Sequence, residues 1–331
     1  MTLQESITMN VLDVSGLTVE IEGREGRVIR VARDLGFSLV PGRVMGVIGE
    51  SGSGKSMAAL SVMRLLPRAA KITGGSIRFK GEDLLTKSPR AMRKIRGRDI
   101  GMILQDPSVS LDPLYTIGDQ IDEALRAHTD LPRARRRARA VELLQAVGIP
   151  SPEMRLGQYP HEMSGGMLQR VVTAIAIALD PALLIADEPT TALDPTIQVQ
   201  VLDLLGSLRD RLGGAILLIT HDFGVAARIC DDIMVMYAGQ IVETGPARAI
   251  FDNPRHPYTR ALMQSSGSPL PGQRLPTIEG APPDLADLPP GCAFAARCPL
   301  ALSRCREQEP PTRPVSPGHQ AACWRSDEVP A

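Results

Sequence analysis

The feature that most constrains this chain is the segment GVIGESGSGKS, which carries the spacing G-x-x-x-x-G-K-S from Gly49 to Ser56. The uninterrupted apolar run VMGVIG before it is typical of a buried strand, and MAALSVMRLL after it predicts a helix. Glycines in such a loop let backbone N–H groups turn toward an anion, and the following helix directs its positive end at the same point. The segment therefore predicts a phosphate-binding loop between a strand and a helix.

Eight consecutive residues form this predicted phosphate site: Gly49, Glu50, Ser51, Gly52, Ser53, Gly54, Lys55 and Ser56. The Lys55 ammonium can reach the β- and γ-phosphates of a nucleotide, and the Ser56 hydroxyl can coordinate Mg²⁺. Two acids end a second apolar run, LLIADEP, far downstream. We expect Asp187 to complete the Mg²⁺ shell and Glu188 to polarise the water that attacks the γ-phosphate.

The rest of the sequence predicts an α/β protein with three zones and a tail. Residues 1–105 alternate apolar and polar residues as strands do, residues 106–180 are mostly helical, and residues 181–250 return to compact apolar strands separated by helices. This alternation is typical of a largely parallel sheet covered by helices. Beyond about residue 267 the chain is rich in proline and cysteine, and such a tail needs a staple to hold its shape.

Composition and charge exclude several classes of protein. The 37 Lys and Arg residues balance 37 Asp and Glu residues, which argues against a generally basic nucleic-acid-binding protein. The best candidate for a membrane span, residues 171–186, is interrupted by Asp180 and Pro181. The N-terminus lacks the basic and apolar regions of a secretory signal. We therefore expect a cytosolic protein that does not cross a membrane.

Five motifs follow the phosphate loop in order, and HEMSGGMLQR at residues 161–170 is the most specific of them. Together they resemble the motifs of ATP-binding-cassette (ABC) ATPases, over residues 11 to about 250. The matching residues are Gln105 in the Q-loop, Ser164, Gly165 and Gly166 in the signature, Asp187 and Glu188 in Walker B, Ala192, Leu193 and Asp194 in the D-loop, and His221 in the switch. The resemblance implies an ABC-type nucleotide-binding domain with a P-loop core sheet, an antiparallel β subdomain and a helical subdomain at about 106–170.

The resemblance also implies a mechanism. Two such domains pair head to tail around two ATP molecules, so this chain needs a second copy or a paralogue. Ser164 to Gly166 and Asp194 would then contact ATP across the pair. Gln105 would contact ATP and Mg²⁺ and sense the γ-phosphate, while His221 would hold the γ-phosphate or the attacking water.

The chain departs from the family pattern at two places. The signature reads MSGGM where LSGGQ is commoner, although its serine and both glycines are present. The family usually stacks an N-terminal aromatic ring on adenine, but no Phe, Tyr or Trp precedes Phe37 here. We expect Ile21 or a neighbour to replace that ring with an apolar contact.

Segments near the C-terminus narrow the resemblance. NPRHPYTRALMQS at 253–265 and GCAFAARCPLALSRC at 291–305 resemble the ATPase subunits of oligopeptide and dipeptide importers. That resemblance implies partners outside the chain, namely two membrane permease subunits and an extracytoplasmic peptide-binding protein, and no nucleic acid. It implies a peripheral location on the cytoplasmic face of the inner membrane. It also divides the chain into a nucleotide-binding domain at 1–250 and an extension at 251–331.

Two other functions stay open. The same importer machinery can carry another cargo, such as a nickel chelate or a sugar, because cargo does not touch this subunit in the family's scheme. A soluble cassette ATPase acting on nucleic acid is the alternative from a different class. The chain lacks the long coiled coil, the second cassette and the zinc module within the cassette that distinguish such proteins.

Four cysteines in the tail are spaced C-x5-C-x6-C-x17-C: Cys292, Cys298, Cys305 and Cys323. Structural zinc sites favour tighter C-x2–4-C pairs, whereas four thiolates also suit a [4Fe–4S] cluster, which the resemblance implies in some relatives. We therefore favour an iron–sulfur cluster, with zinc or free thiols as alternatives. We expect Cys230 to be a buried apolar residue, His319 to lie at the surface, and His256–Thr259 to pack the extension onto the ATPase domain.

Overall fold

The computed structural model describes residues 10–23, 26–191, 193–266 and 277–330. These residues form two compact units that interleave along the chain. The first unit consists mainly of residues 40–42 and 86–217. The second consists of residues 12–39, 43–85 and 218–331. The phosphate loop and the C-terminal extension therefore belong to the same unit.

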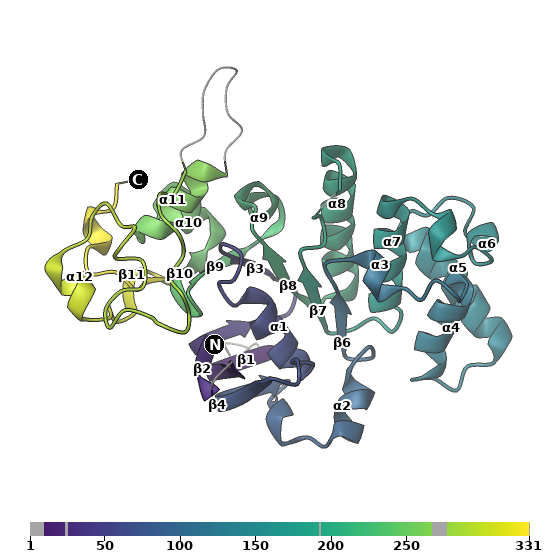
Figure 1. The fold of residues 1–331 in the computed structure, drawn as a ribbon. Helices are drawn as coiled ribbons and strands as arrows, with labels where there is room; N and C mark the ends of the chain where they lie inside the picture. Colours follow the sequence, from purple (N-terminus) through teal and green to yellow (C-terminus); the bar gives the residue numbers. More distant parts are fainter. Residues whose placement is uncertain (1–9, 24–25, 192, 267–276, 331) are drawn as a thin grey trace, which may run out of the picture. The chain divides into compact units, whose positions relative to one another are not determined.

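The second unit contains a four-stranded antiparallel sheet in the order β2-β1-β4-β5 (Figure 1). Its strands are β1 (Leu12–Glu22), β2 (Val28–Leu39), β4 (Ala70–Phe79) and β5 (Glu82–Asp83). Leu12 and Val14 of β1 are buried, as are Leu17 and Val19 beyond a shift in register, which matches the alternation in the sequence. The predicted antiparallel β subdomain is confirmed.

A second sheet of this unit carries the phosphate loop. Five of its strands are neighbours in the order β3-β9-β10-β12-β11. Their bounds are β3 (Val44–Ile48), β9 (Asp232–Tyr237), β10 (Gln240–Pro246), β11 (Arg313–Ser316) and β12 (His319–Ala321). Strand β3 pairs in parallel with β9, and all of its residues are buried, as a continuous apolar run predicts. Strand β8 (Ala215–Thr220) crosses the boundary between the two units.

Short helices complete the second unit. They are α1 (Lys55–Met63), α9 (Phe223–Ile229), α10 (Ala247–Asp252), α11 (Pro257–Ser265) and α12 (Ser303–Glu307), with 3-10 turns η2 (Leu84–Thr86, which ends in the first unit) and η4 (Ser326–Glu328). Helix α1 follows the phosphate loop directly, so the strand–loop–helix order predicted from the sequence is confirmed. None of the helices in the described ranges combines the length and apolarity that a membrane crossing requires.

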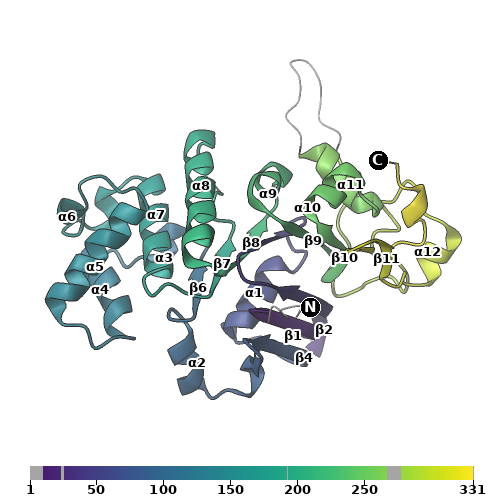
Figure 2. The same ribbon diagram turned by 180° about the vertical axis from the view of Figure 1, so that it is seen from behind.

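The first unit is mostly helical, and Figure 2 shows α4 to α7 gathered in one bundle. Its elements are α2 (Pro89–Ile95), β6 (Ile100–Ile103), α3 (Pro107–Ser110), α4 (Ile117–Arg126), α5 (Arg133–Ala146), α6 (Pro152–Arg155), η3 (Pro160–Glu162), α7 (Gly165–Ala176), β7 (Leu183–Asp187) and α8 (Pro195–Leu212). Strands β6 and β7 pair in parallel. Thr116 and Asp119 form a capping box that starts α4. The helical zone predicted at 106–180 is confirmed.

The C-terminal extension shares a hydrophobic core with the phosphate-loop sheet. Ile48 of β3 and Tyr237 of β9 belong to the same buried cluster as Tyr258 of α11 and Phe294. His256 and Thr259 are also buried, as is Pro257 between them. The prediction that His256–Thr259 packs the extension onto the ATPase core is confirmed.

The prediction for His319 was wrong, because this residue is 2% exposed. Its Nε2 lies 2.8 Å from Oε1 of Glu243, a buried carboxylate on β10. Glu243 also accepts hydrogen bonds from the backbone N–H groups of Arg255 and His256. A buried carboxylate needs several donors, and His319 is placed inside to supply one of them.

Cys230 is only partly buried, although its surroundings are apolar as expected. A Cβ placed on Gly46 of β3 would lie 2.8 Å from its Sγ, so the thiol occupies the space beside a glycine. Burial raises the pKa of this thiol to about 12, which makes it unreactive.

Candidate functional site

The phosphate loop links β3 to α1 and passes close to backbone on two sides. A Cβ at Gly49 would lie 2.3 Å from the carbonyl oxygen of Met236. Gly54 has φ +100°, and a Cβ there would lie 2.3 Å from the carbonyl oxygen of Val31. Only glycine fits at these two positions, so the loop's path depends on them.

Lys55 begins α1 and turns back over the loop. Its Nζ donates to the carbonyl oxygens of Gly49 at 2.7 Å and Glu50 at 2.9 Å, and the residue is buried. The N-terminal end of α1 and the Lys55 ammonium thus lie together, so an anion here would meet positive charge from both. The neighbouring Ser53 is also buried, and its hydroxyl has no hydrogen-bond partner in the part of the chain that the structure describes.

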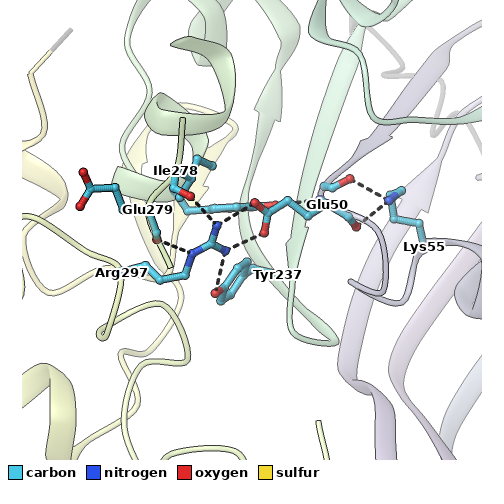
Figure 3. A network of polar contacts seen from close by, with 8 residues as sticks. Glu50, Lys55, Tyr237, Ile278, Glu279 and Arg297 are labelled. Carbon is cyan, nitrogen blue, oxygen red and sulfur yellow. Dashed lines mark hydrogen bonds and ion pairs between the residues drawn. The ribbon is translucent and has the colours of Figure 1, made fainter. Parts of the chain in front are cut away.

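Residues from outside the loop hold Glu50 in place (Figure 3). No local pattern in the sequence predicts these contacts. Its backbone N–H donates to the hydroxyl oxygen of Tyr258 at 2.8 Å. Its two carboxylate oxygens accept from the two terminal nitrogens of Arg297, at 2.7 and 3.0 Å. Tyr258 and Arg297 both belong to the C-terminal extension.

The end of β7 carries a second part of the predicted site, in the first unit. Asp187 is buried, and Glu188 adopts a left-handed backbone conformation with φ +47°. Oε2 of Glu188 accepts hydrogen bonds from Nε2 of Gln105 at 3.1 Å and from Oγ1 of Thr191 at 2.8 Å. The structure therefore brings Gln105 and Glu188 together, and it adds Thr191, which the sequence analysis missed.

The signature motif lies at the start of α7. Ser164 caps this helix by accepting from the backbone N–H of Met167 at 3.4 Å, and both Ser164 and Gly165 are exposed. A Cβ on Gly166 would lie 3.0 Å from Ile197, so this glycine allows close packing on α8. The exposed N-terminal turn of α7 directs its backbone N–H groups outward, and helix starts of this kind bind phosphate.

The remaining predicted site residues lie at other helix starts. Asp194 caps α8 by accepting from the backbone N–H groups of Thr196 and Ile197. Leu193 is partly buried, and Ala192 lies outside the described residues. His221 follows β8, is exposed, and belongs to the same unit as the phosphate loop.

The four tail cysteines line one small pocket. None of them forms a disulfide. Burial raises the pKa of the thiols of Cys292 and Cys323 to about 11 and also raises that of Cys298. Within the described ranges no three His, Cys, Asp or Glu side chains are arranged to hold a metal ion. The structure therefore does not support the predicted iron–sulfur cluster or the zinc alternative.

Comparisons with known proteins identify the family of this chain. A family model described as ABC transporter matches residues 32–191, and one described as oligopeptide/dipeptide transporter, C-terminal region, matches residues 242–305. A relative from Sinorhizobium fredii, named a probable peptide ABC transporter ATP-binding protein, is 51% identical over 322 residues, which cover 96% of each chain.

Solved structures give the same result for the fold. A dimeric ATP-binding cassette bound to ADP and Pi is 26% identical, with a TM-score of 0.65, over 72% of this chain and 99% of that one. The cbiO1 subunit of an ABC transporter complex from Clostridium perfringens is 26% identical, with a TM-score of 0.63, over 73% and 91%.

The fold and the ordered motifs define an ATP-hydrolysing ATP-binding cassette. The chain belongs to the ABC transporter family, and its C-terminal region is that of the oligopeptide and dipeptide transporters within it.

Proposed function

We propose that this subunit hydrolyses ATP to power the import of di- and oligopeptides through an ABC transporter. One observation carries the proposal: a single chain joins the ordered cassette motifs to the C-terminal region of oligopeptide and dipeptide transporters at 242–305. The relative from Sinorhizobium fredii is similar to this chain over 96% of its own length and is named a probable peptide ABC transporter ATP-binding protein.

The phosphate loop, Gly49 to Ser56, binds the phosphates of ATP. Lys55 exchanges its two carbonyl contacts for oxygens of the β- and γ-phosphates, since a phosphate is the stronger acceptor for an ammonium. Ser56, Gln105 and Asp187 would hold Mg²⁺, for which hydroxyl, amide and carboxylate oxygens are suitable ligands. When bound, the ion would neutralise part of the negative charge on the phosphates.

Glu188 acts as the general base. Its carboxylate accepts a proton from the attacking water while the oxygen of that water bonds to the γ-phosphorus and the bond to the ADP oxygen breaks. The hydrogen bonds from Gln105 and Thr191 fix the carboxylate for this task. His221 holds the γ-phosphate or the attacking water.

A second ATPase subunit, either another copy or a paralogue, completes the site. Its phosphate loop faces Ser164 to Gly166 and Asp194 of this chain, and the exposed start of α7 supports that pairing. Two membrane permease subunits and an extracytoplasmic peptide-binding protein complete the importer. The subunit then lies on the cytoplasmic face of the inner membrane and binds no nucleic acid.

The chain has two functional parts. Residues 1–250 form the nucleotide-binding domain, in which a helical subdomain at about 106–170 connects to the permeases. Residues 251–331 form the extension, part of which matches the C-terminal region of oligopeptide and dipeptide transporters.

Although the described side chains form no metal-binding group, we propose that Cys292, Cys298, Cys305 and Cys323 together take a [4Fe–4S] cluster. Backbone N–H groups donate to sulfur at each cysteine, including Leu302 to Cys305 and Arg325 to Cys323. Such donors stabilise cluster sulfur, and the cluster would supply a rigid cross-link to this tail. Anaerobic purification tests the idea: visible absorption that Cys298→Ser removes supports a cluster, and a colourless, iron-free wild-type protein rejects it.

The test of the proposed function is the ATPase activity of the complex with its co-purified permeases and binding protein, challenged with a panel of short peptides. We expect peptides to stimulate hydrolysis. Stimulation only by nickel chelates or sugars would keep the transport ATPase and discard the peptide cargo. Stimulation by nucleic acid in the absence of permeases would indicate the soluble class of cassette ATPase.

A further inference from the structure

We propose that Arg297, in the C-terminal extension, is a positioning residue. Its ion pair with the carboxylate of Glu50 holds the phosphate loop in its ATP-binding conformation. Glu50 is one of the four variable positions inside the G-x-x-x-x-G-K-S spacing, so the motif itself does not require an acid there. The inference rests on the proposed role of Gly49 to Ser56 in binding ATP. It adds a role for the extension in that step.

The contact between Arg297 and Glu50 is a bidentate ion pair. Both terminal nitrogens of Arg297 donate, one to each carboxylate oxygen of Glu50, at 2.7 and 3.0 Å. The arginine side chain is 5% exposed and the glutamate side chain 23% exposed. A planar pair of this kind fixes direction as well as distance, and partial burial protects it from screening by salt.

Arg297 cannot easily move, because its other contacts hold it. Its Nε donates to the carbonyl oxygen of Glu279 at 3.1 Å, and Nη2 also donates to that of Ile278 at 3.3 Å. Nη1 also reaches the hydroxyl of Tyr237 at 3.3 Å. Figure 3 shows the guanidinium at the centre of these contacts, facing the Glu50 carboxylate. The arginine therefore provides a fixed point for the loop.

The backbone of Glu50 is also held by the extension, and it contacts Lys55 of the phosphate loop. The hydroxyl of Tyr258 accepts the backbone N–H of Glu50, and the carbonyl oxygen of Glu50 accepts from Lys55. The Tyr258 ring packs against Tyr237 with centroids 4.5 Å apart and against Phe294 at 5.3 Å. A displacement of Glu50 would therefore also displace Lys55, the residue that binds the phosphates.

The decisive variant is Arg297→Gln in the full chain, purified with its permeases. We expect the Kd for Mg·ATP and the KM for ATP to rise about tenfold, equivalent to about 1.4 kcal/mol, while kcat falls less than about twofold. A weaker affinity for ATP with an almost unchanged kcat marks an interaction that is used in binding and not in the chemical step. An unchanged Kd in a folded Arg297→Gln protein would overturn the proposal.

The double variant Arg297→Gln with Glu50→Gln separates positioning from charge. If Arg297 positions the loop, the Kd stays about tenfold high, because the side chain of residue 50 has lost its ion pair. If Arg297 only neutralises an acid near the phosphates, removing that acid restores the wild-type Kd. Restoration would therefore overturn the positioning role.

Tyr258→Phe keeps the proposal testable if Arg297→Gln does not fold. This change keeps the ring in its packed site and removes only the hydroxyl that accepts the Glu50 N–H. We expect a rise in Kd of about threefold, the usual effect of one hydrogen bond. An unchanged Kd in this variant would count against the extension's role in holding the loop.

Two controls isolate the effect. Glu309→Gln removes the ion pair with Arg33 of β2, which also joins the extension to the cassette. We expect less than about a twofold change in Kd, as for an exposed pair. Lys55→Ala tests the site itself: if it leaves ATP binding intact, the proposed nucleotide site has failed. If it abolishes binding while the Arg297 variants bind normally, only the positioning role has failed.

Discussion

At the scale of single residues, Glu188 combines backbone strain with a fixed side chain. A non-glycine residue at φ +47° costs about 1–2 kcal/mol, and the cost persists only where the surroundings impose it. Here the conformation directly follows buried Asp187 and leaves the carboxylate bonded to Gln105 and Thr191. The strain lies at the residue to which we assign the proton transfer.

Glu188→Gln should therefore separate ATP binding from hydrolysis. The amide retains the shape and one acceptor oxygen but cannot take a proton from water, so we expect the rate of phosphate release to fall by about 10²-fold or more. ATP should still bind and should trap a closed dimer, visible by size-exclusion chromatography. Rapid turnover by this variant would mean that another group is the base.

At the scale of elements, α11 of the extension packs against the cassette core, and the buried His256 lies directly before it. Nδ1 of His256 accepts the backbone N–H of Tyr258 at 3.1 Å and so caps the helix. Burial lowers the pKa of His256 to about 4, against 6.5 for an exposed histidine, although nearby Glu243 opposes the shift. The imidazole is therefore neutral in the folded protein.

This shift predicts a loss of stability in acid. Between pH 6.5 and about 4 the unfolded chain binds a proton at His256 that the folded chain does not, so unfolding becomes easier as pH falls. His256→Asn retains a capping oxygen but does not titrate. We expect the free energy of unfolding of the wild type to fall more steeply than that of the variant, by up to about 1.4 kcal/mol per pH unit. Parallel profiles from denaturant melts at several pH values would contradict this account.

The local pattern of the sequence predicted the helices and strands well. It predicted contacts between residues far apart in the chain poorly. The run from Val44 to Met63 specifies its own strand, loop and helix, because each part has its own periodicity and glycine spacing. The pair of Glu50 and Arg297 joins residues 247 positions apart, and neither residue is unusual in its own segment. His319 was misplaced for the same reason: only its distant partner, Glu243, makes its burial favourable.

At the scale of the whole molecule, the extension is part of the core that supports the phosphate loop. Phe294 is 1% exposed and packs against the rings of Tyr237 and Tyr258, both at 5.3 Å between centroids. Because Ile48 at the end of β3 belongs to the same cluster, the strand before the loop loses packing when the extension is disturbed.

Phe294→Ala should therefore destabilise the cassette and not only the tail. We expect a loss of about 3–5 kcal/mol in one cooperative transition, measured by calorimetry on the full chain. Leu302→Ala is the matched control, since this extension residue is 44% exposed and should cost less than about 0.5 kcal/mol. A separate low-temperature transition for the tail, with the main transition unchanged, would show that the extension folds independently.

The central claim is that ATP hydrolysis at Glu188 powers peptide import, and uptake measures it most directly. The complete importer in membrane vesicles, with ATP on the side of this subunit, would be offered a labelled dipeptide together with its binding protein. We predict that the wild type accumulates the peptide only when Mg·ATP is present and that Glu188→Gln accumulates none. Equal accumulation by the wild type and the variant, or accumulation without ATP, would contradict the account.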